Sequence, residues 1–473
     1  QTHPLPGYLP PMSATITYPK TAKLAHVDDY FGTQVADPYR WLEDDTASAV
    51  KAWVAEQNQV TFDYLARVPF RDRLRARLEE LYNYPKTSAP VRTGPYYTFL
   101  KNDGLQNQAV LYLQQGLDGP PEVLLDPNTL STDGTVRLGA AALSRDGRCF
   151  GYGLSTGGSD WLELRIMETA NRRELLDKIE WVKFSDIGWH GNGFFYSRYP
   201  APDDATSALS GPNEHHHVYY HQLGTSQADD ALVYSDPTHP KRFHFTTVTE
   251  DERYLILNVS DRAEAGNDGN EIWVRDLREA DGVFRRVIAG FEDTHSVIDN
   301  VGDKLLVQTN RGAPNWRVVA IDPAQPEDAA WREILPEQAE PLEMATSAGG
   351  RLFATYLEDV THRVYVYSHA GQLEREISLP ALGTIGAVEG RADDDEVFFT
   401  FSSFTYPPTT FRYDIAAGTA STYRKTAVPF DPDQFVTRQV FVPSKDGANV
   451  PMYCYHPGLT PVGSCRICRR CNA

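Results

Sequence analysis

A repeating pattern of hydrophobic and polar positions dominates the chain from about Tyr84 to Lys425. In each unit a turn signal opens a run of β-branched and aromatic residues, a polar gap follows, and a second run alternates large side chains with polar ones. Residues 146–152 and 161–166 show this order, and the later units repeat it. Period-two alternation between turn signals is typical of antiparallel strands. The spacing of about 45 to 60 residues lies in the range of propeller blades.

The repeats predict a mainly β fold built as a seven-bladed β-propeller. One further unit at the start, residues 96–100 with 110–113, brings the count to seven. Radial stacking covers both faces of each four-stranded sheet and leaves few open edges. A pair of β-sandwich domains is the alternative, but it does not explain the regular order of turn, strand, gap and strand.

Two helices are predicted before the first repeat, over residues 47–66 and 71–82. Val50 belongs to an apolar stripe in the first, and Leu74 and Leu78 stand at helical spacing in the second. Helices with such stripes need a partner, and the faces of a propeller are not an obvious one. The sequence therefore indicates a further layer.

Charge and composition narrow the functional classes. The formal net charge of -19 argues against a nucleic-acid or anionic-membrane surface, because both require clustered Lys and Arg. No apolar run approaches the roughly 20 residues that span a bilayer, so we expect a soluble protein. Only Cys149 occurs among the first 450 residues, which suits a reducing compartment or a fold indifferent to disulfides. The compartment stays open: cytoplasmic, or periplasmic or secreted after removal of a signal.

Several short motifs occur in a fixed order along the chain. They are an Asp-Pro-Tyr-Arg-Trp-Leu-Glu run at 37–43, a Gly- and Ser-rich run ending in Asp-Trp at 153–161, and the segments 182–185, 219–225 and 444–452. Together they resemble the prolyl oligopeptidase family of serine peptidases. The resemblance extends to about Gly463, nearly the whole chain.

The resemblance implies a two-domain enzyme in which a propeller is inserted into an α/β-hydrolase. On this interpretation residues 1–82 are an N-terminal helical segment of the hydrolase, 83–427 are the propeller, and 428–473 begin the larger hydrolase piece as a remnant. Residues 435–442 and 449–455 would form a hairpin of the hydrolase sheet. The two helices then have their layer.

The implied chemistry uses a serine activated by a histidine that an aspartate orients, with the serine on a Gly-x-Ser-x-Gly elbow between a strand and a helix. In the family these residues lie downstream of the segment that 450–452 resembles, so none is carried over to this sequence. We expect a serine endopeptidase that hydrolyses short peptides on the carboxyl side of proline, here a fragment without the triad and so inactive. A stand-alone propeller that acts as a binding module or pseudo-enzyme is the alternative.

Residues 153–157 match the elbow pattern literally and would make Ser155 a nucleophile. An alternating run follows them rather than a helix. The serine side chain would then not project from the end of a sheet as it does in a nucleophile elbow, and the match indicates a blade hairpin.

The last ten residues have a different composition from the rest. Cys465, Cys468 and Cys471 recur at regular spacing, with Cys454 and His456 nearby, and could supply thiolate and imidazole ligands to zinc. No loop or second knuckle frames them, however. Codons for this stretch, read in a shifted frame, can encode residues that resemble the next strand of the family. We therefore expect a frameshift or premature stop rather than a metal site.

The resemblance also implies three site residues. Phe184 matches a position that packs against the substrate beyond the proline pocket, Phe243 falls where the family places another apolar contact, and Asp160 matches a position that faces the hydrolase across the domain gap. The alternative roles are core aromatics for the two Phe residues and a turn residue for Asp160.

The expected partners follow from the same resemblance: short proline-containing peptides, with no nucleic acid and no membrane, bound by a monomer without cofactors. Residues 215–217 are three successive histidines. Neighbouring residues of a strand point to opposite faces, so they do not converge easily on one metal ion. We interpret them as a solvated loop-to-strand junction.

Overall fold

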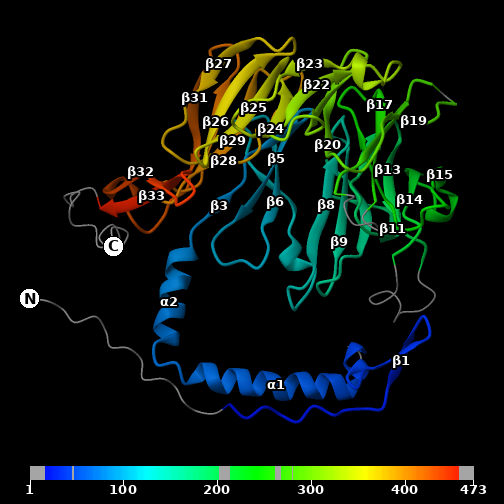
Figure 1. Ribbon diagram of the computed structural model, residues 1–473, viewed down its shortest axis with the longest axis vertical. Coiled ribbons are helices and arrows are strands. Elements are labelled where there is room, and N and C mark those ends of the chain that lie inside the picture. The colour runs from blue at the N-terminus through cyan, green and yellow to red at the C-terminus, as the bar shows by residue number, and fades with distance from the viewer. Residues whose placement is uncertain (1–15, 45–46, 202–212, 262–267, 280, 458–473) are drawn as a thin grey trace, which may run out of the picture. The chain divides into compact units, whose positions relative to one another are not determined.

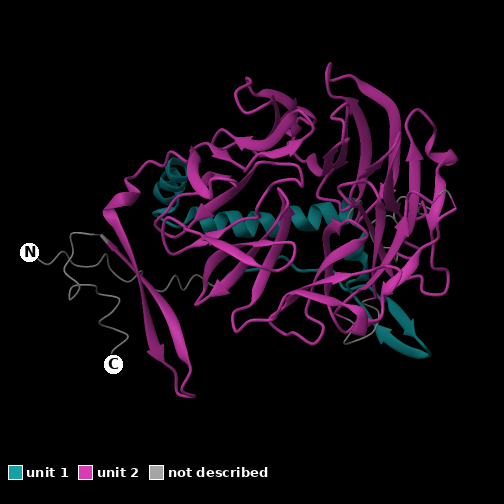
Figure 2. Ribbon diagram, turned by 90° about the horizontal axis from the view of Figure 1, so that it is seen from above, with its two compact units in different colours: residues 1–82, 204–208 teal, residues 83–203, 209–473 magenta. Residues whose placement is uncertain are grey.

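The computed structural model describes residues 16–44, 47–201, 213–261, 268–279 and 281–457. The chain divides into two compact units, residues 1–82 with 204–208 and residues 83–203 with 209–473 (Figure 2). The cysteine-rich end at 464–473 lies outside the described residues, so the structure says nothing about the zinc site or the shifted reading frame.

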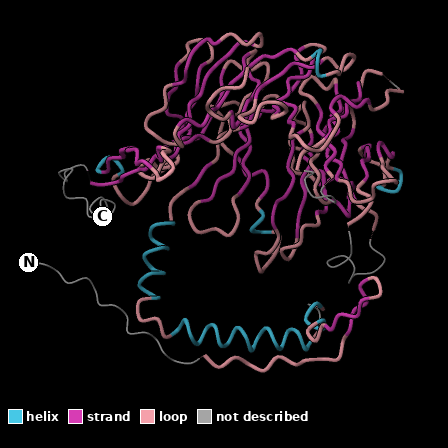
Figure 3. Tube along the Cα trace, in the orientation of Figure 1, coloured by secondary structure: helices cyan, strands magenta, loops and turns pink. Residues whose placement is uncertain are grey.

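The α-helices of the described chain belong to the first unit (Figure 3). Helices α1 (Ser48–Ala66) and α2 (Arg71–Tyr82) confirm the two predicted helices. Val50 is the one residue of α1 that is buried, and α2 buries none of its residues. Leu74 and Leu78 are 52% and 45% exposed, so the apolar stripe of α2 is open to solvent.

A small hairpin precedes these helices. It consists of β1 (Val27–Tyr30) and β2 (Thr33–Ala36), and the 3-10 helix η1 (Arg40–Glu43) follows it. The Arg40 guanidinium forms ion pairs with Asp28, Asp37 and Glu43, the last at 2.7 Å, and thereby ties η1 to the hairpin. In the described part of the chain, neither α-helix combines the length and the apolarity needed to span a bilayer.

The second unit consists almost entirely of antiparallel sheets (Figure 1). Four of these sheets have four strands each, in chain order. Their strands are β16 (Phe243–Val248), β17 (Tyr254–Ser260), β18 (Glu271–Asp276) and β19 (Arg285–Ile288); β20 (His295–Val301), β21 (Lys304–Thr309), β22 (Arg317–Ile321) and β23 (Arg332–Leu335); β24 (Leu342–Ala348), β25 (Arg351–Glu358), β26 (Thr361–Ser368) and β27 (Leu373–Ile377); β28 (Thr384–Ile385), β29 (Glu396–Ser402), β30 (Thr409–Asp414) and β31 (Thr419–Lys425).

Two larger sheets contain the earlier strands of this unit. The five-stranded sheet contains β3 (Lys86–Thr87), β4 (Val91–Thr93), β5 (Tyr96–Asn102), β6 (Val110–Gln115) and β7 (Glu122–Leu125). The eight-stranded sheet contains β8 (Arg137–Leu143), β9 (Cys149–Ser155), β10 (Leu162–Glu168), β11 (Glu174–Val182), β12 (Gly188–His190), β13 (Gly193–Arg198), β14 (His217–Gln222) and β15 (Ala231–Tyr234). Short 3-10 helices lie in the connections: η2 (Pro127–Thr129), η3 (Gln227–Asp229), η4 (Asp328–Ala330) and η5 (Pro432–Gln434).

The number of separate blades differs from the expected seven. Among the described residues, five sheets have the four or five strands of a single blade. The eight-stranded sheet takes the place of separate blades because β11 pairs with β13 through Val182 and Arg198, which joins two groups of strands by hydrogen bonds.

Consecutive sheets bury their apolar faces against each other. In one cluster Ile256 and Ile272 pack with Leu305 and Val319 of the next sheet, and equivalent clusters join the following pairs. The first and last sheets also meet. The Arg391 Nε–H donates to the Arg92 carbonyl at 2.7 Å. Stacked sheets whose order closes on itself form a β-propeller.

A separate hairpin follows the last sheet. Strands β32 (Phe435–Pro443) and β33 (Asn449–Pro457) pair along their full length, which confirms the hairpin expected there. Two strands do not constitute an α/β-hydrolase sheet, so the structure shows the hairpin and not the hydrolase remnant.

Candidate functional site

The end of β11 and the turn that follows it have an unusual backbone. Trp181 and Phe184 both adopt left-handed conformations, with φ of 63° and 53°. Bulky residues avoid this region because their side chains crowd the backbone, at a cost of about 1 to 3 kcal/mol each. Such strain persists only where neighbouring groups hold the chain, and it concentrates at functional sites. The turn therefore marks a candidate site.

Phe184 projects from this turn with 42% of its surface exposed. Its ring meets the edge of the Phe243 ring, with 5.4 Å between centroids and 81° between planes. Phe243 is the first residue of β16 and is partly buried. The structure thus brings together the two aromatic residues that the sequence identified separately, from segments about 60 residues apart in the chain.

Lys183 connects this aromatic pair to Asp160. The Lys183 ammonium lies 5.3 Å from the centroid of the Phe184 ring and 5.1 Å from that of Trp161. It lies 3.8 Å from an Asp160 carboxylate oxygen. The Asp160 side chain is 66% exposed in the hairpin between β9 and β10, so it is free to contact another molecule or domain.

The three histidines before and within β14 do not converge on one point, as the sequence predicted, but the interpretation of a solvated junction is wrong for the middle one. His216 is fully buried, whereas the rings of His215 and His217 lie 6.0 Å apart on the other side. The His216 Nε2 is 2.9 Å from the Lys183 carbonyl. Burial, and then the neighbouring His244, lower the pKa of His216 to about 3. Among the residues the structure describes, no three His, Cys, Asp or Glu side chains are arranged to hold a metal ion.

Ser155 lies in a blade hairpin, as predicted. It ends β9, and the next element is the antiparallel strand β10. Its side chain is buried and its hydroxyl donates to the Ser159 carbonyl. A serine held in this way is not available as a nucleophile.

The structure contains one Ser–His contact that the sequence does not predict. The Ser347 hydroxyl lies 3.1 Å from the His369 Nε2. No hydrogen bond or ion pair joins His369 to a carboxylate in the described part of the chain, so the orienting group of a triad is missing there. No motif marks this pair, because Ser347 lies on β24 and His369 lies in the turn after β26.

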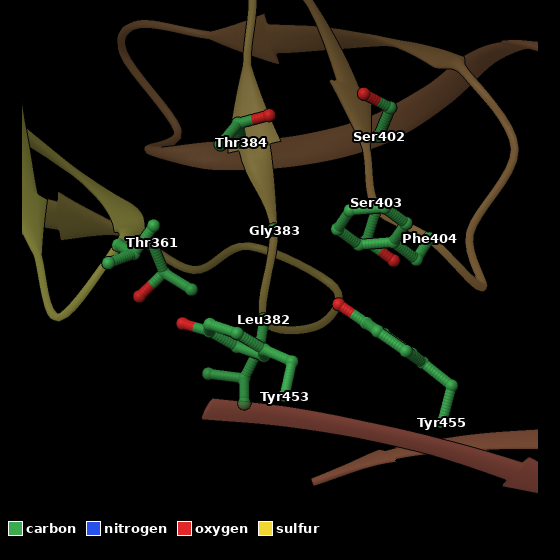
Figure 4. Close-up of a pocket in the computed structure, with 10 residues that line it drawn as sticks. Thr361, Leu382, Gly383, Thr384, Ser402, Ser403, Phe404, Tyr453 and Tyr455 are labelled. Carbon is green, nitrogen blue, oxygen red and sulfur yellow. The ribbon is translucent and has the colours of Figure 1, made fainter. Parts of the chain in front are cut away.

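A groove lies elsewhere in the second unit, between the C-terminal hairpin and the last two sheets (Figure 4). Its volume is about 360 Å³. The Tyr453 and Tyr455 side chains face Leu382 and Phe404 across it. The Tyr453 hydroxyl donates to the Asp359 carbonyl at 2.7 Å. The described lining of the groove contains no carboxylate, imidazole, amine or thiol, and burial raises the pKa of the Tyr453 and Tyr455 phenols. Its side chains therefore offer binding surface and not acid–base chemistry.

The chemistry of the cluster around Phe184 is also that of a binding site. It presents aromatic faces, one ammonium group and one exposed carboxylate, which are groups that orient a ligand. No base is aimed at a nucleophile among them. The sequence missed the roles of Lys183 and Trp161, because cation–aromatic contacts between hairpins leave no local signal.

Comparison with known proteins agrees with this architecture. A family model described as "Prolyl oligopeptidase, N-terminal beta-propeller domain" matches residues 19–426. The chain is 41% identical to a prolyl endopeptidase of Elizabethkingia miricola over 441 residues, which are 93% of this chain and 61% of that protein. It is 32% identical to the dual function macrocyclase-peptidase of Galerina marginata, covering 92% of this chain and 64% of that one.

Solved structures give the same result. A structure from a study of two prolyl endopeptidases superposes with a TM-score of 0.82 at 33% identity and covers 94% of this chain and 65% of that one. Prolyl oligopeptidase B of Galerina marginata, bound to a 25mer macrocyclization substrate, superposes with a TM-score of 0.81 at 30% identity and covers 94% and 66%. The chain therefore spans less than two thirds of the length of these relatives.

Proposed function

Because the chain belongs to the prolyl oligopeptidase family, we propose that it forms the propeller of a serine endopeptidase that hydrolyses short peptides on the carboxyl side of proline. The family match over residues 19–426 carries this proposal. The exposed aromatic pair at a strained turn supports it, because strained segments concentrate at binding and catalytic sites.

The proposed role of Phe184 and Phe243 is to contact the part of the peptide substrate that lies beyond the proline pocket. The exposed face of Phe184 supplies the apolar surface, and the edge of Phe243 limits how far the ring can turn. Asp160 is proposed to face the hydrolase, since its carboxylate is exposed and only 3.8 Å from the Lys183 ammonium.

We assign the eight-stranded sheet to two blades, which restores seven. Ile166 and Ile179 of one strand group pack on Phe194 and Tyr196 of the other, as in the contacts between separate sheets. The strand ladder between the groups consists of one residue pair, Val182 and Arg198. The proposed domains remain 1–82, 83–427 and 428–473. The exposed apolar residues of α2 and of the hairpin, such as Phe441, suit elements that cover a hydrolase sheet.

Peptide binding tests the role of Phe184. Fluorescence anisotropy of a labelled, N-blocked peptide containing Gly-Pro should show saturable binding to the chain. We expect Phe184→Ala to weaken it about tenfold, the loss of one aromatic contact of about 1.4 kcal/mol. Phe430→Ala is the matched control, because Phe430 is similarly exposed at 46% but belongs to the segment before the C-terminal hairpin. Equal affinities of the two variants for the peptide would show that Phe184 does not belong to the binding site.

A turnover assay tests whether this polypeptide acts alone. We expect the chain to show no hydrolysis of a fluorogenic Gly-Pro substrate that is sensitive to a serine reagent. The reason is that no described serine has both a histidine and a carboxylate arranged behind it. Reagent-sensitive turnover that disappears in Ser347→Ala would contradict this expectation and assign the chemistry to the Ser347–His369 pair.

A further inference from the structure

The backbone at Phe184 is strained, but the Phe184 ring itself has few contacts that would fix it. Phe184 has a φ of 53° and an exposed side chain. Its ring contacts the edge of Phe243 and the Lys183 ammonium. The direction of the ring must therefore be determined by groups that hold the backbone on either side.

On the far side of the turn, the Ser185 hydroxyl fixes the chain. It accepts the Ser197 N–H at 2.8 Å and donates to the Asp186 carbonyl at 2.8 Å. On the near side, the Lys183 carbonyl contacts the buried His216 ring at 2.9 Å. Both neighbours of Phe184 are thus held by hydrogen bonds.

His216 also contacts the backbone next to Phe243. The His244 N–H donates to the His216 Nδ1 at 3.0 Å. A backbone N–H can only donate and a carbonyl can only accept, so the hydrogen bonds require the neutral ring with its proton on Nε2. The ring is stacked on Tyr199 at 4.6 Å, which restricts its rotation.

We propose that His216 is a positioning residue for the peptide site, because one imidazole bridges Lys183, which precedes Phe184, and His244, which follows Phe243. It sets the distance and angle between the two aromatic rings without touching the peptide. The inference rests on the proposed peptide-binding role of Phe184 and Phe243, and it assigns to His216 the specificity for the residue that those rings contact.

Two variants separate the hydrogen bonds from simple packing. His216→Leu keeps bulk but removes both hydrogen bonds, whereas His216→Gln keeps an amide N–H donor for the Lys183 carbonyl. Hydrogen–deuterium exchange should rise about tenfold in His216→Leu and much less in His216→Gln at two amides of this site, because local opening governs exchange. These are the Ser197 amide, which donates to the Ser185 hydroxyl, and the His244 amide, which donates to the His216 Nδ1. Unchanged exchange in His216→Leu would overturn the proposal whether or not the chain binds peptides.

A double-mutant cycle then tests whether His216 acts through Phe184. We expect His216→Leu to weaken binding of the labelled Gly-Pro peptide about threefold to tenfold in the native background and not at all in the Phe184→Ala background, because residues that act through one contact are not additive. Additive losses would contradict a positioning role. If Phe184→Ala alone leaves binding unchanged, the proposed function fails, and the exchange measurement still decides the position of the turn.

The native protein gives a third test that needs no variant. Nitrogen NMR of the histidine rings at neutral pH should show His216 as the Nε2–H tautomer. The Nδ1–H tautomer or an imidazolium would contradict the bridging hydrogen bonds.

Discussion

At the scale of single residues, the fold keeps several histidines neutral by burying them. His295 is 2% exposed and its Nδ1 lies 2.8 Å from the Thr309 hydroxyl. Burial, and then the charge of Arg311, lower the pKa of His295 to about 4. His216 is also buried and its pKa is also lowered. Its role differs, because its two hydrogen bonds to the backbone hold the turn at Phe184.

These histidines predict loss of stability in acid. An unfolded histidine has a pKa of about 6.5, and His295 in the fold has one of about 4. Between these values His295 of the unfolded chain binds a proton that the folded chain does not. The contribution of His295 to the free energy of unfolding is therefore complete above about pH 6.5 and falls as the pH decreases toward 4. The upper limit is about 3 kcal/mol for this residue.

Urea unfolding at pH 7 and pH 5 measures this effect. We expect His295→Gln to reduce the difference between the two pH values, because an amide does not titrate. His239→Gln is the control, since the His239 side chain is 49% exposed. An equal pH dependence in native protein and His295→Gln would show that another group is responsible.

The residue scale is also where the sequence failed most. Phe184, Phe243 and Asp160 were identified only through resemblance to a family, because an isolated Phe in a β protein looks like a core residue. Their assembly through Lys183 and His216 depends on contacts between segments that lie more than 20 residues apart. No local pattern records such contacts.

At the scale of elements, alternation predicted the middle strands of the sheets well. The predicted runs at 96–100 and 110–113 lie within β5 and β6. The first strands were missed. β20 buries one residue of seven and leaves the others partly exposed, and therefore has no clear alternation. The β11–β13 pairing was also missed, since a single hydrogen-bonded pair leaves no trace in the pattern.

The junction between the first and last sheets gives a test at this scale. The Asp394 carboxylate is 4% exposed, pairs with Arg92, and accepts the Arg391 N–H at 2.8 Å. We expect Asp394→Asn to lower the free energy of unfolding by about 1 to 3 kcal/mol. The substitution removes the carboxylate charge and leaves the part-buried Arg92 guanidinium without its ion-pair partner.

The adjacent residue is a matched control for this junction. The Asp393 carboxylate is 78% exposed and lies 3.9 Å from the same Arg92. Asp393→Asn should change the free energy of unfolding by less than about 0.5 kcal/mol, as exposed ion pairs contribute little. Equal effects of the two variants in urea unfolding would mean that the buried carboxylate does not secure the junction.

At the scale of the whole molecule, the proposed peptide site lies at one strained turn of the propeller. The family match covers residues 19–426, and the relatives are peptidases that this chain matches over less than two thirds of their length. Stacked sheets position Phe184 and Phe243 from different strand groups, and His216 bridges the backbones next to both. The aromatic groove at Tyr453 and Tyr455 is the competing surface in the second unit.

Photolabelling tests this account most directly. An N-blocked Gly-Pro peptide that carries a benzophenone side chain on the residue before the Gly-Pro pair is irradiated with the chain, and mass spectrometry locates the adduct. We expect labels on the segments that contain Phe184 and Phe243, and we expect excess unlabelled peptide to suppress them. Labels confined to the groove at Phe404 and Tyr455, or spread over the surface without competition, would contradict it.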